Sequence, residues 1–137
     1  MMHLMMQEAL KIFMTKKDSH LDYVCPVCFN QIDHCSCDRM SWYAIQIDRN
    51  IQQHIRMLNT KGYKTKYCCE SHKPTESMYI EFNYDCGIGD VIELPEGFEK
   101  HGNGVSWICK RNMTDDEYKS EKNKHLKYLL DWCKSLP

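Results

Sequence analysis

The sequence predicts an α+β fold in which a small antiparallel sheet of three to four strands packs against helices, with a zinc knuckle inserted near the N-terminus. The strand candidates cluster between helical patterns without alternating strictly with them, which favours an antiparallel sheet covered by helices. Four cysteines fall in one short run ahead of these patterns. A chain of 137 residues has room for one modest core, so we predict a single domain over 1–137 with the knuckle at about 25–38.

The cysteine run is the strongest motif, and it reads CPVCFNQIDHCSC over residues 25–37. A Cys-x-x-Cys turn lets two sulfurs face one ion, and the following Cys-x-Cys closes the shell from the other side. A structural zinc site takes four tetrahedral nitrogen or sulfur ligands and keeps no open position. The spacing therefore predicts a closed zinc site, with four unligated thiols as the alternative, and zinc as cofactor; its ligands would be Cys25, Cys28, Cys35 and Cys37.

Cysteine usage also bears on the compartment. The chain has nine cysteines, an odd number, and one run holds four of them, which is typical of metal-binding or thiol proteins in a reducing environment. The apolar N-terminus is short and lacks a basic leader, so we expect a helix over 2–14 rather than a signal peptide. No run reaches the roughly 20 apolar residues of a membrane span. We expect a cytoplasmic protein with no membrane partner.

Two further helices are predicted from apolar spacing. The first covers about 44–58, with Ser41 as a candidate N-cap and Gly62 in the left-handed position after its end. The second follows Thr114, which forms a capping box with Glu117. The apolar positions on one side of each helix are Ala44, Ile47, Ile51, Ile55 and Leu58 in the first, which step by three or four, and Tyr118, Leu126, Leu129, Cys133 and Leu136 in the second.

The strands are predicted from alternation between polar and apolar residues. The clearest is 78–84, where Met78, Ile80, Phe82 and Tyr84 share one face. Gly and Pro mark turns at 95–97 and 101–104. The other strand candidates are 63–68, 91–94 and 105–109.

Charge is segregated along the chain although the net charge is only −1. Residues 56–73 hold five basic residues and one acid, whereas residues 76–99 hold seven acids and no Lys or Arg. Segregation of this kind can form a dipolar surface that attracts a charged partner at one face. Two solvated faces of an ordinary sheet explain the pattern equally well. The net charge of the chain is close to zero, so nucleic-acid binding is only weakly supported.

A second candidate site lies at Tyr67-Cys68-Cys69-Glu70-Ser71-His72, where the first strand of the central cluster should end. Adjacent cysteines on a strand point to opposite faces, so at most one of them shares a face with His72. Cys69 and His72 could hold metal, as a second site or as shared ligands of the first. They could also be a nucleophile and its base, or Cys68 could be a core thiol and His72 a turn residue.

Residues 25–98 resemble a group of uncharacterised small bacterial and phage cysteine-rich proteins. The shared motifs are Cys-Pro-x-Cys at 25–28, a helix ending Leu-Asn-x-Lys-Gly-Tyr at 58–63, Tyr-Cys-Cys-x-Gly-His at 67–72 and Leu-Pro-x-Gly-Phe at 94–98. This chain has Ser71 where the group has Gly, and Ser enters a left-handed conformation at greater cost. The group has no agreed activity, so the resemblance implies none for this chain.

Two classes of function remain open. The first is a zinc-stabilised intracellular binding module that acts on a protein partner as a regulator or inhibitor, and the resemblance to phage products extends this to host defence machinery such as a nuclease. The alternative is an enzyme working through Cys69 and His72, or a nucleic-acid-binding protein acting on RNA. We favour the non-enzymatic binding module, because no third group is visible in the sequence to orient the imidazole of His72.

Overall fold

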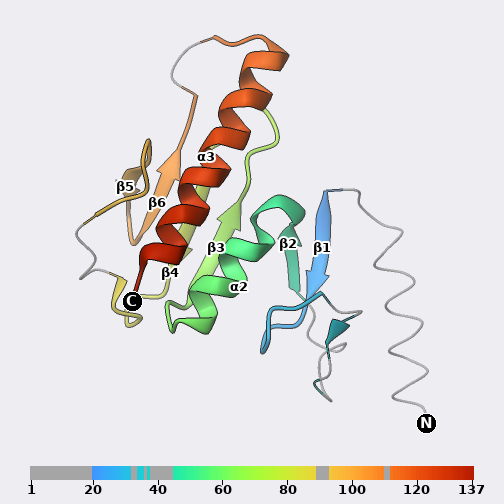
Figure 1. Ribbon diagram of the computed structural model, residues 1–137, viewed down its shortest axis with the longest axis vertical. Helices are drawn as coiled ribbons and strands as arrows, with labels where there is room; N and C mark the ends of the chain where they lie inside the picture. The colour runs from blue at the N-terminus through green and yellow to red at the C-terminus, as the bar shows by residue number, and fades with distance from the viewer. Residues whose placement is uncertain (1–19, 32–33, 36, 38–44, 89–92, 110–111) are drawn as a thin grey trace. The chain divides into compact units, whose positions relative to one another are not determined.

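The computed structural model describes residues 20–31, 34–35, 37, 45–88, 93–109 and 112–137 (Figure 1). Contacts group the chain into two compact units, Met1–Gln52 and Gln53–Pro137, and the single domain expected over 1–137 stays a prediction. Each unit has its own antiparallel sheet, of two strands in the first and four in the second. The α+β class is therefore confirmed. The helix expected over 2–14, the cap Ser41 and the residues Ala44, Val91 and Ile92 lie outside the described residues.

The first unit contains a strand pair that the sequence analysis did not predict. Strand β1 (Leu21–Val24) pairs with β2 (Ile45–Asp48), so that Val24 lies opposite Ile45. Arg49 Nε contacts Asp22 Oδ1 at 3.1 Å, and Gln31 Nε2 donates to Asp22 Oδ2 at 3.0 Å. The carboxylate of Asp22 thus holds together the strand pair and the segment that follows β1.

The helix expected over 44–58 begins later than its periodicity indicated. Ile47 is buried in β2, a 3-10 turn η3 covers Arg49–Ile51, and helix α2 covers Gln52–Thr60. Ile47 and Ile51 are four residues apart and both buried, which is why spacing alone could not distinguish a strand followed by a turn from one continuous helix.

Helix α2 ends as its sequence indicated. Gly62 has φ +95°, and the N–H groups of Gly62 and Tyr63 donate to the carbonyls of Asn59 and Leu58 at 3.1 and 2.9 Å. These two bonds form the Schellman motif, which satisfies carbonyls that the last helical turn leaves unpaired.

The sheet of the second unit has the strand order β3-β4-β6-β5. Strand β4 pairs with β3 on one side and with β6 on the other, and β5 pairs with β6 at the edge. The turn at 101–104 joins β5 to β6 as predicted, but β5 itself was missed because its three residues are all exposed. Glu93 and Leu94 belong to no strand, so the strand expected over 91–94 is wrong for its described residues. The bounds are Thr65–Cys69 for β3, Met78–Phe82 for β4, Glu99–His101 for β5 and Gly104–Trp107 for β6.

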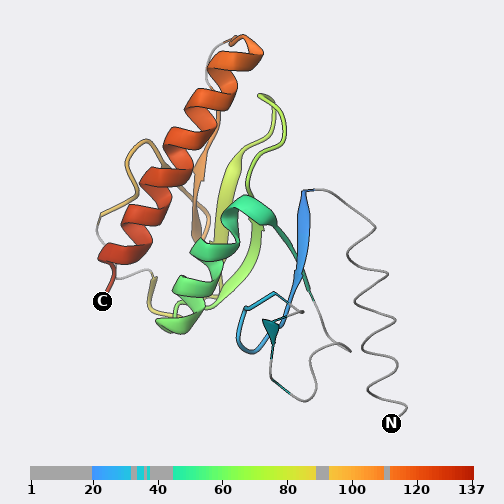
Figure 2. The same ribbon diagram turned by 45° about the vertical axis from the view of Figure 1, so that its right-hand side comes forward.

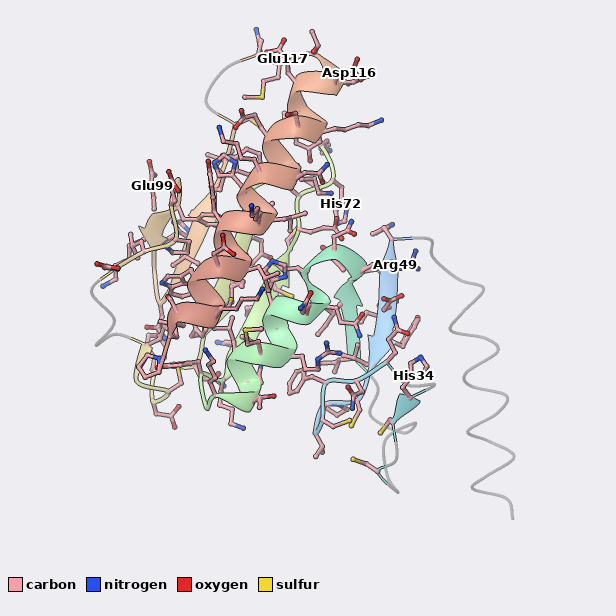
Figure 3. All side chains as sticks on the ribbon, viewed as in Figure 1. His34, Arg49, His72, Glu99, Asp116 and Glu117 are labelled. Atoms are coloured by element: carbon pink, nitrogen blue, oxygen red, sulfur yellow. The ribbon has the colours of Figure 1, made fainter. Side chains whose placement is uncertain are left out.

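Helix α3 (Asp115–Ser135) begins at the predicted cap. Thr114 Oγ1 accepts the N–H of Glu117 at 3.2 Å, and the acids of the first turn suit the positive end of the helix dipole (Figure 3). The buried face differs slightly from the expected one, because Leu126 is half-buried whereas His125 and Trp132 are buried.

Helices α2 and α3 cover the same face of the four-stranded sheet (Figures 1 and 2). Met78, Ile80 and Phe82 of β4 are all buried beneath them, and the Phe82 and Trp132 rings meet edge to face with centroids 6.4 Å apart. Tyr84 was expected on this face, but it lies beyond the end of β4 and is 88% exposed. None of the described helices lies on the opposite face of the sheet, which we call the uncovered face.

Candidate metal centre

The four cysteines of the 25–37 run come together in the first unit. Their sulfur atoms all lie within 4.8 Å of one another, and the Cys28 and Cys35 sulfurs are 3.7 Å apart. Cys25 is completely buried, and Cys28, Cys35 and Cys37 pack against it together with Tyr23. The four thiols therefore form the apolar centre of this segment.

A tight turn after β1 brings the first two sulfurs together. The N–H of Phe29 donates to the carbonyl of Cys25 at 2.8 Å, and the N–H of Cys25 donates to the carbonyl of Asn30 at 3.0 Å. Val24 forms an isolated bridge with Gln31, which closes the base of the turn. Phe29 takes the left-handed conformation at φ +58°, which is costly for a bulky residue and is found where the surroundings enforce it.

Backbone N–H groups point at two of the sulfurs. Cys25 Sγ accepts from the N–H groups of Val27 and Cys28 at 3.2 and 3.3 Å, and Cys35 Sγ accepts from the N–H of Cys37 at 3.3 Å. Donors aimed at a sulfur favour its ionised form, which is the form that binds metal. The donor set therefore fits a thiophilic cation such as zinc.

The pKa values of the thiols show how strongly the cluster resists holding several negative charges. For Cys28, burial acts to raise the pKa, but the Asn30 backbone and the neighbouring thiols outweigh it and lower the pKa below the ordinary value. Burial raises the pKa of Cys35 to about 12. The Cys35 thiol lowers the pKa of Cys37, but burial and the charges of Cys25 and Cys28 outweigh it, so the net shift is upward. A bound divalent cation would supply the positive charge that four thiolates require.

The second predicted pair, Cys69 and His72, also comes together, and a carboxylate joins it. Cys69 Sγ at the end of β3 lies within 4.8 Å of a ring nitrogen of His72 and a carboxylate oxygen of Glu76, and those two also lie within 4.8 Å of each other in the loop between β3 and β4. Glu76 was not predicted as a site residue, although its position four residues after His72 in a Pro-containing turn was the available signal. Among the described residues the four cysteines of the run form one group of potential ligands, and Cys69, His72 and Glu76 form another.

No family model, curated protein or solved structure matches the chain. In the described part of the chain, none of the helices is both long and apolar enough to cross a membrane.

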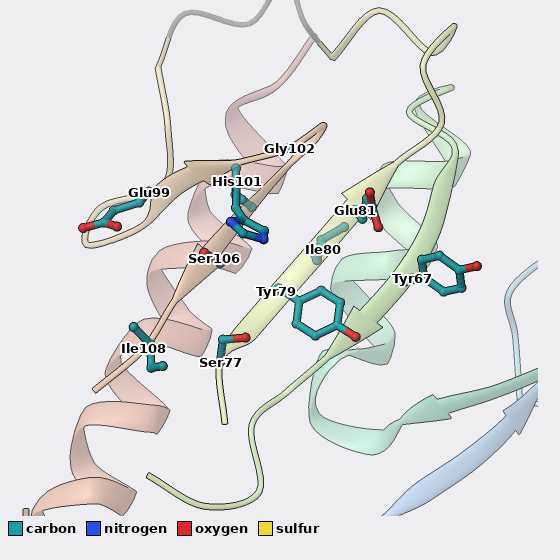
Figure 4. A pocket seen from close by; sticks show the side chains of 11 residues that line it. Tyr67, Ser77, Tyr79, Ile80, Glu81, Glu99, His101, Gly102, Ser106 and Ile108 are labelled. Carbon is teal, nitrogen blue, oxygen red and sulfur yellow. The ribbon is translucent and has the colours of Figure 1, made fainter. Parts of the chain in front are cut away.

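The uncovered face of the four-stranded sheet carries a groove of about 550 Å³ (Figure 4). The strand register explains its lining, because directly paired residues share a face: Tyr67 lies opposite Glu81, and Tyr79 lies opposite Ser106. Figure 4 shows these side chains on the side of the sheet away from the helices. Sequence analysis did not predict this groove. The lining residues are Tyr67, Ser77, Tyr79, Ile80, Glu81, Glu99, His101, Gly102, Val105, Ser106 and Ile108.

Proposed function

We propose that this protein is a zinc-stabilised binding module that acts on a protein partner and performs no chemistry of its own. The observation that carries the proposal is the mutual approach of four cysteine sulfurs within 4.8 Å. Four thiolate ligands fill a tetrahedral zinc shell, and a filled shell is structural rather than catalytic. None of the nine cysteines is in a disulfide bond, which supports a reducing compartment such as the cytoplasm.

The groove on the sheet is the surface we propose for the partner. It contains two carboxylates, Glu81 and Glu99, and two tyrosines, and no Lys or Arg occurs among the eleven described residues that line it. Carboxylates attract cationic side chains, and the faces of tyrosine rings bind ammonium and guanidinium groups. The complementary partner is therefore a protein segment that carries Arg or Lys.

A regulatory or inhibitory role follows if the protein binds its partner without catalysing a reaction. A module that binds without reacting acts by blocking or holding its partner. The resemblance of residues 25–98 to small bacterial and phage proteins supports a target in host defence machinery, such as a nuclease.

The zinc half of the proposal is tested by elemental analysis of protein purified without chelator. We expect zinc to be retained, and the single variants Cys25→Ser and Cys28→Ser to lose it together with the β1–β2 structure, because structural zinc binding contributes directly to folding. Cys86→Ser is the matched control, since Cys86 belongs to no cluster of metal-binding groups among the described residues, and it should keep its zinc. Metal-free wild-type protein that is fully folded would contradict the proposal.

The partner half is tested with two peptides of equal length, one rich in Arg and one rich in Glu. In amide NMR spectra we expect the Arg peptide to shift resonances of β4, β5 and β6 near the groove, and the Glu peptide to leave them unchanged. The double variant Glu81→Gln/Glu99→Gln should weaken binding of the Arg peptide several-fold. Shifts scattered over the whole surface, or unaffected by this variant, would exclude the groove as the binding surface.

A further inference from the structure

The loop between β3 and β4 is built so that three metal-binding side chains converge. Strand β3 ends at Cys69, and β4 begins at Met78. Between them the N–H of Glu76 donates to the carbonyl of Lys73 at 2.9 Å, which closes a turn with Pro74 at its second position. The turn folds the chain back on itself, so that Glu76 returns to His72.

Hydrogen bonds within the loop hold this arrangement. The N–H of His72 donates to Glu76 Oε1 at 2.8 Å, and the N–H of Ser71 donates to Cys69 Sγ at 3.4 Å. The second bond is the same kind of N–H to sulfur contact that supports Cys25 and Cys35 in the four-cysteine cluster. The segment that carries each cluster also contains a non-glycine residue in the left-handed conformation, Phe29 in the first and Ser71 at φ +71° in the second.

The residues between the three convergent side chains anchor the loop to helix α3. The carboxylate of Glu70 is almost fully buried and pairs with Lys122 Nζ at 2.7 Å. Ser71 is completely buried, and its hydroxyl forms a 2.7 Å hydrogen bond with the Tyr118 hydroxyl. Tyr118 and Lys122 are four residues apart and lie on one side of α3. Neighbouring residues of the loop therefore have different tasks: Glu70 and Ser71 fix its position, and Cys69 and His72 carry the donor atoms.

We infer that Cys69, His72 and Glu76 form a second metal site, for zinc or a similar divalent transition metal, with one open coordination position. Thiolate, imidazole and carboxylate are all ligands that zinc accepts. Binding releases the thiol proton of Cys69 to solvent, and the thiolate and carboxylate together balance the two charges of the cation. His72, labelled in Figure 3, has an exposed side chain, so water can occupy the fourth position.

The mutual distances favour a metal site over a catalytic triad. In a nucleophile–base–carboxylate relay the imidazole stands between the sulfur and the carboxylate, so those two groups are not neighbours. Here all three donor atoms lie within 4.8 Å of one another, sulfur and carboxylate included. One carboxylate oxygen of Glu76 also accepts a hydrogen bond from the backbone N–H of His72, so the carboxylate does not act only on the imidazole ring.

Cobalt titration of the full-length protein tests the inference, because Co²⁺ reports thiolate ligands by charge-transfer absorption. We expect metal-depleted wild-type protein to bind two equivalents, one with four thiolates and one with a single thiolate. The variants Cys69→Ser and His72→Ala should bind one equivalent and keep the four-thiolate spectrum. His72 is exposed, so its replacement should leave the fold intact, which circular dichroism verifies.

Cys68→Ser is the matched control, since Cys68 is adjacent to Cys69 but belongs to no group of metal-binding residues in the described part of the chain. It should bind two equivalents. A single equivalent in the wild type, unchanged in Cys69→Ser and His72→Ala, would overturn the inference while leaving the four-cysteine site standing. Rapid alkylation of Cys69 in metal-loaded protein, slowed by His72→Ala, would overturn it in favour of a catalytic thiol.

Discussion

Ser71 shows how a single residue can be kept in an unfavourable conformation. Its φ of +71° lies in the left-handed region, which L-residues other than Gly enter at a cost of roughly 1 kcal/mol or more. The carbonyls of Glu76 and Lys73 share the single proton of its hydroxyl at 2.9 and 3.2 Å, and its oxygen accepts a 2.7 Å hydrogen bond from the Tyr118 hydroxyl. These bonds offset the backbone cost and explain how a serine can occupy this position.

We predict that Ser71→Ala destabilises the protein by about 2 kcal/mol, because it loses the three bonds and keeps the strained backbone. Ser71→Gly loses the same bonds but relieves the strain, so it should be less destabilising than Ser71→Ala, the reverse of the usual order. Urea denaturation of both variants measures the two free energies of unfolding. If Ser71→Gly proved as destabilising as Ser71→Ala, or more so, the assignment of strain to Ser71 would be contradicted.

Lys61 was counted among the basic residues of 56–73, but its ammonium group has a structural role. It donates to the carbonyls of Cys133, Lys134 and Leu136 at 2.8, 3.0 and 2.6 Å. These are carbonyls at the C-terminal end of α3, where a positive charge also suits the helix dipole. Lys61 is therefore not available as a phosphate contact, which weakens the nucleic-acid alternative further.

We predict that Lys61→Met destabilises the protein by roughly 1.5–3 kcal/mol, the range for hydrogen bonds to a charged donor. Lys64→Met is the matched control, because Lys64 is exposed, and it should change stability by less than about 0.5 kcal/mol. Thermal unfolding followed by circular dichroism compares the two. Similar melting temperatures would show that the three carbonyl contacts contribute little.

At the scale of the elements, the close approach of the segment before β5 to helix α3 requires a glycine at position 97. Gly97 has φ +77°, and a Cβ at this position would lie 2.6 Å from Nε2 of His125. His125 is held in place by stacking on Trp107, with ring centroids 4.3 Å apart, and by a 2.7 Å contact of Nδ1 with the carbonyl of Glu121. The imidazole cannot move away without losing these contacts, so the segment approaches α3 closely only because residue 97 has no side chain.

We predict that Gly97→Ala is clearly more destabilising than Gly87→Ala. Gly87 has a similar φ of +79°, but a Cβ there would meet nothing within 4 Å. The backbone cost, about 1 kcal/mol, is common to both variants, so the difference between them isolates the clash with His125. Chemical denaturation measures both, and equal losses would show that the segment shifts to accommodate the methyl group.

The elements that sequence analysis predicted correctly are those whose signals are local. The capping box of Thr114, the left-handed Gly62 and the alternation of Met78, Ile80 and Phe82 each depend on a few neighbouring residues. Strands β1, β2 and β5 were missed because each is short and is defined by its partner strand rather than by its own pattern. The four-cysteine cluster was predictable from its spacing. Glu76 was missed although it meets His72 through a local turn, whereas the groove depends on strand register and on contacts between distant segments.

Across the whole molecule, the two units differ in what stabilises them. The second unit has a sheet with Met78, Ile80 and Phe82 buried beneath two helices. In the first unit, Cys25 and the three cysteines packed against it form the centre of the knuckle. Because the interior of the knuckle consists of thiols, its stability should depend on the zinc that we propose they bind.

We predict that a strong zinc chelator removes amide-exchange protection from β1 and β2 but leaves β4, β6 and α3 protected. Lowering the pH should have the same selective effect, since protons compete with zinc for thiolates and the raised pKa values of Cys35 and Cys37 favour the protonated form. Hydrogen exchange followed by mass spectrometry separates the two units. Simultaneous loss of protection in both would show that the metal stabilises the whole chain as one cooperative unit.

The net charge of −1 limits nucleic-acid binding at the scale of the molecule. Few phosphates can be neutralised, so we predict at most weak RNA or DNA binding that disappears at moderate ionic strength. Fluorescence anisotropy at several salt concentrations measures this. Tight binding that is abolished by Lys64→Glu and Lys66→Glu would instead support the nucleic-acid alternative.

Helix α3 forms hydrogen bonds with segments far upstream in the sequence, so the second unit should fold slowly. Its contacts reach Ser71, Glu93 and Lys61 across 47, 39 and 72 residues of sequence respectively. Closing loops of this length before any contact forms is entropically unfavourable, and folding slows as contacts become more distant in sequence. During synthesis the apolar face of β4 is made well before the helix that covers it. The nascent chain must therefore keep that face from aggregating until α3 has emerged, an interval in which binding to a chaperone would be advantageous.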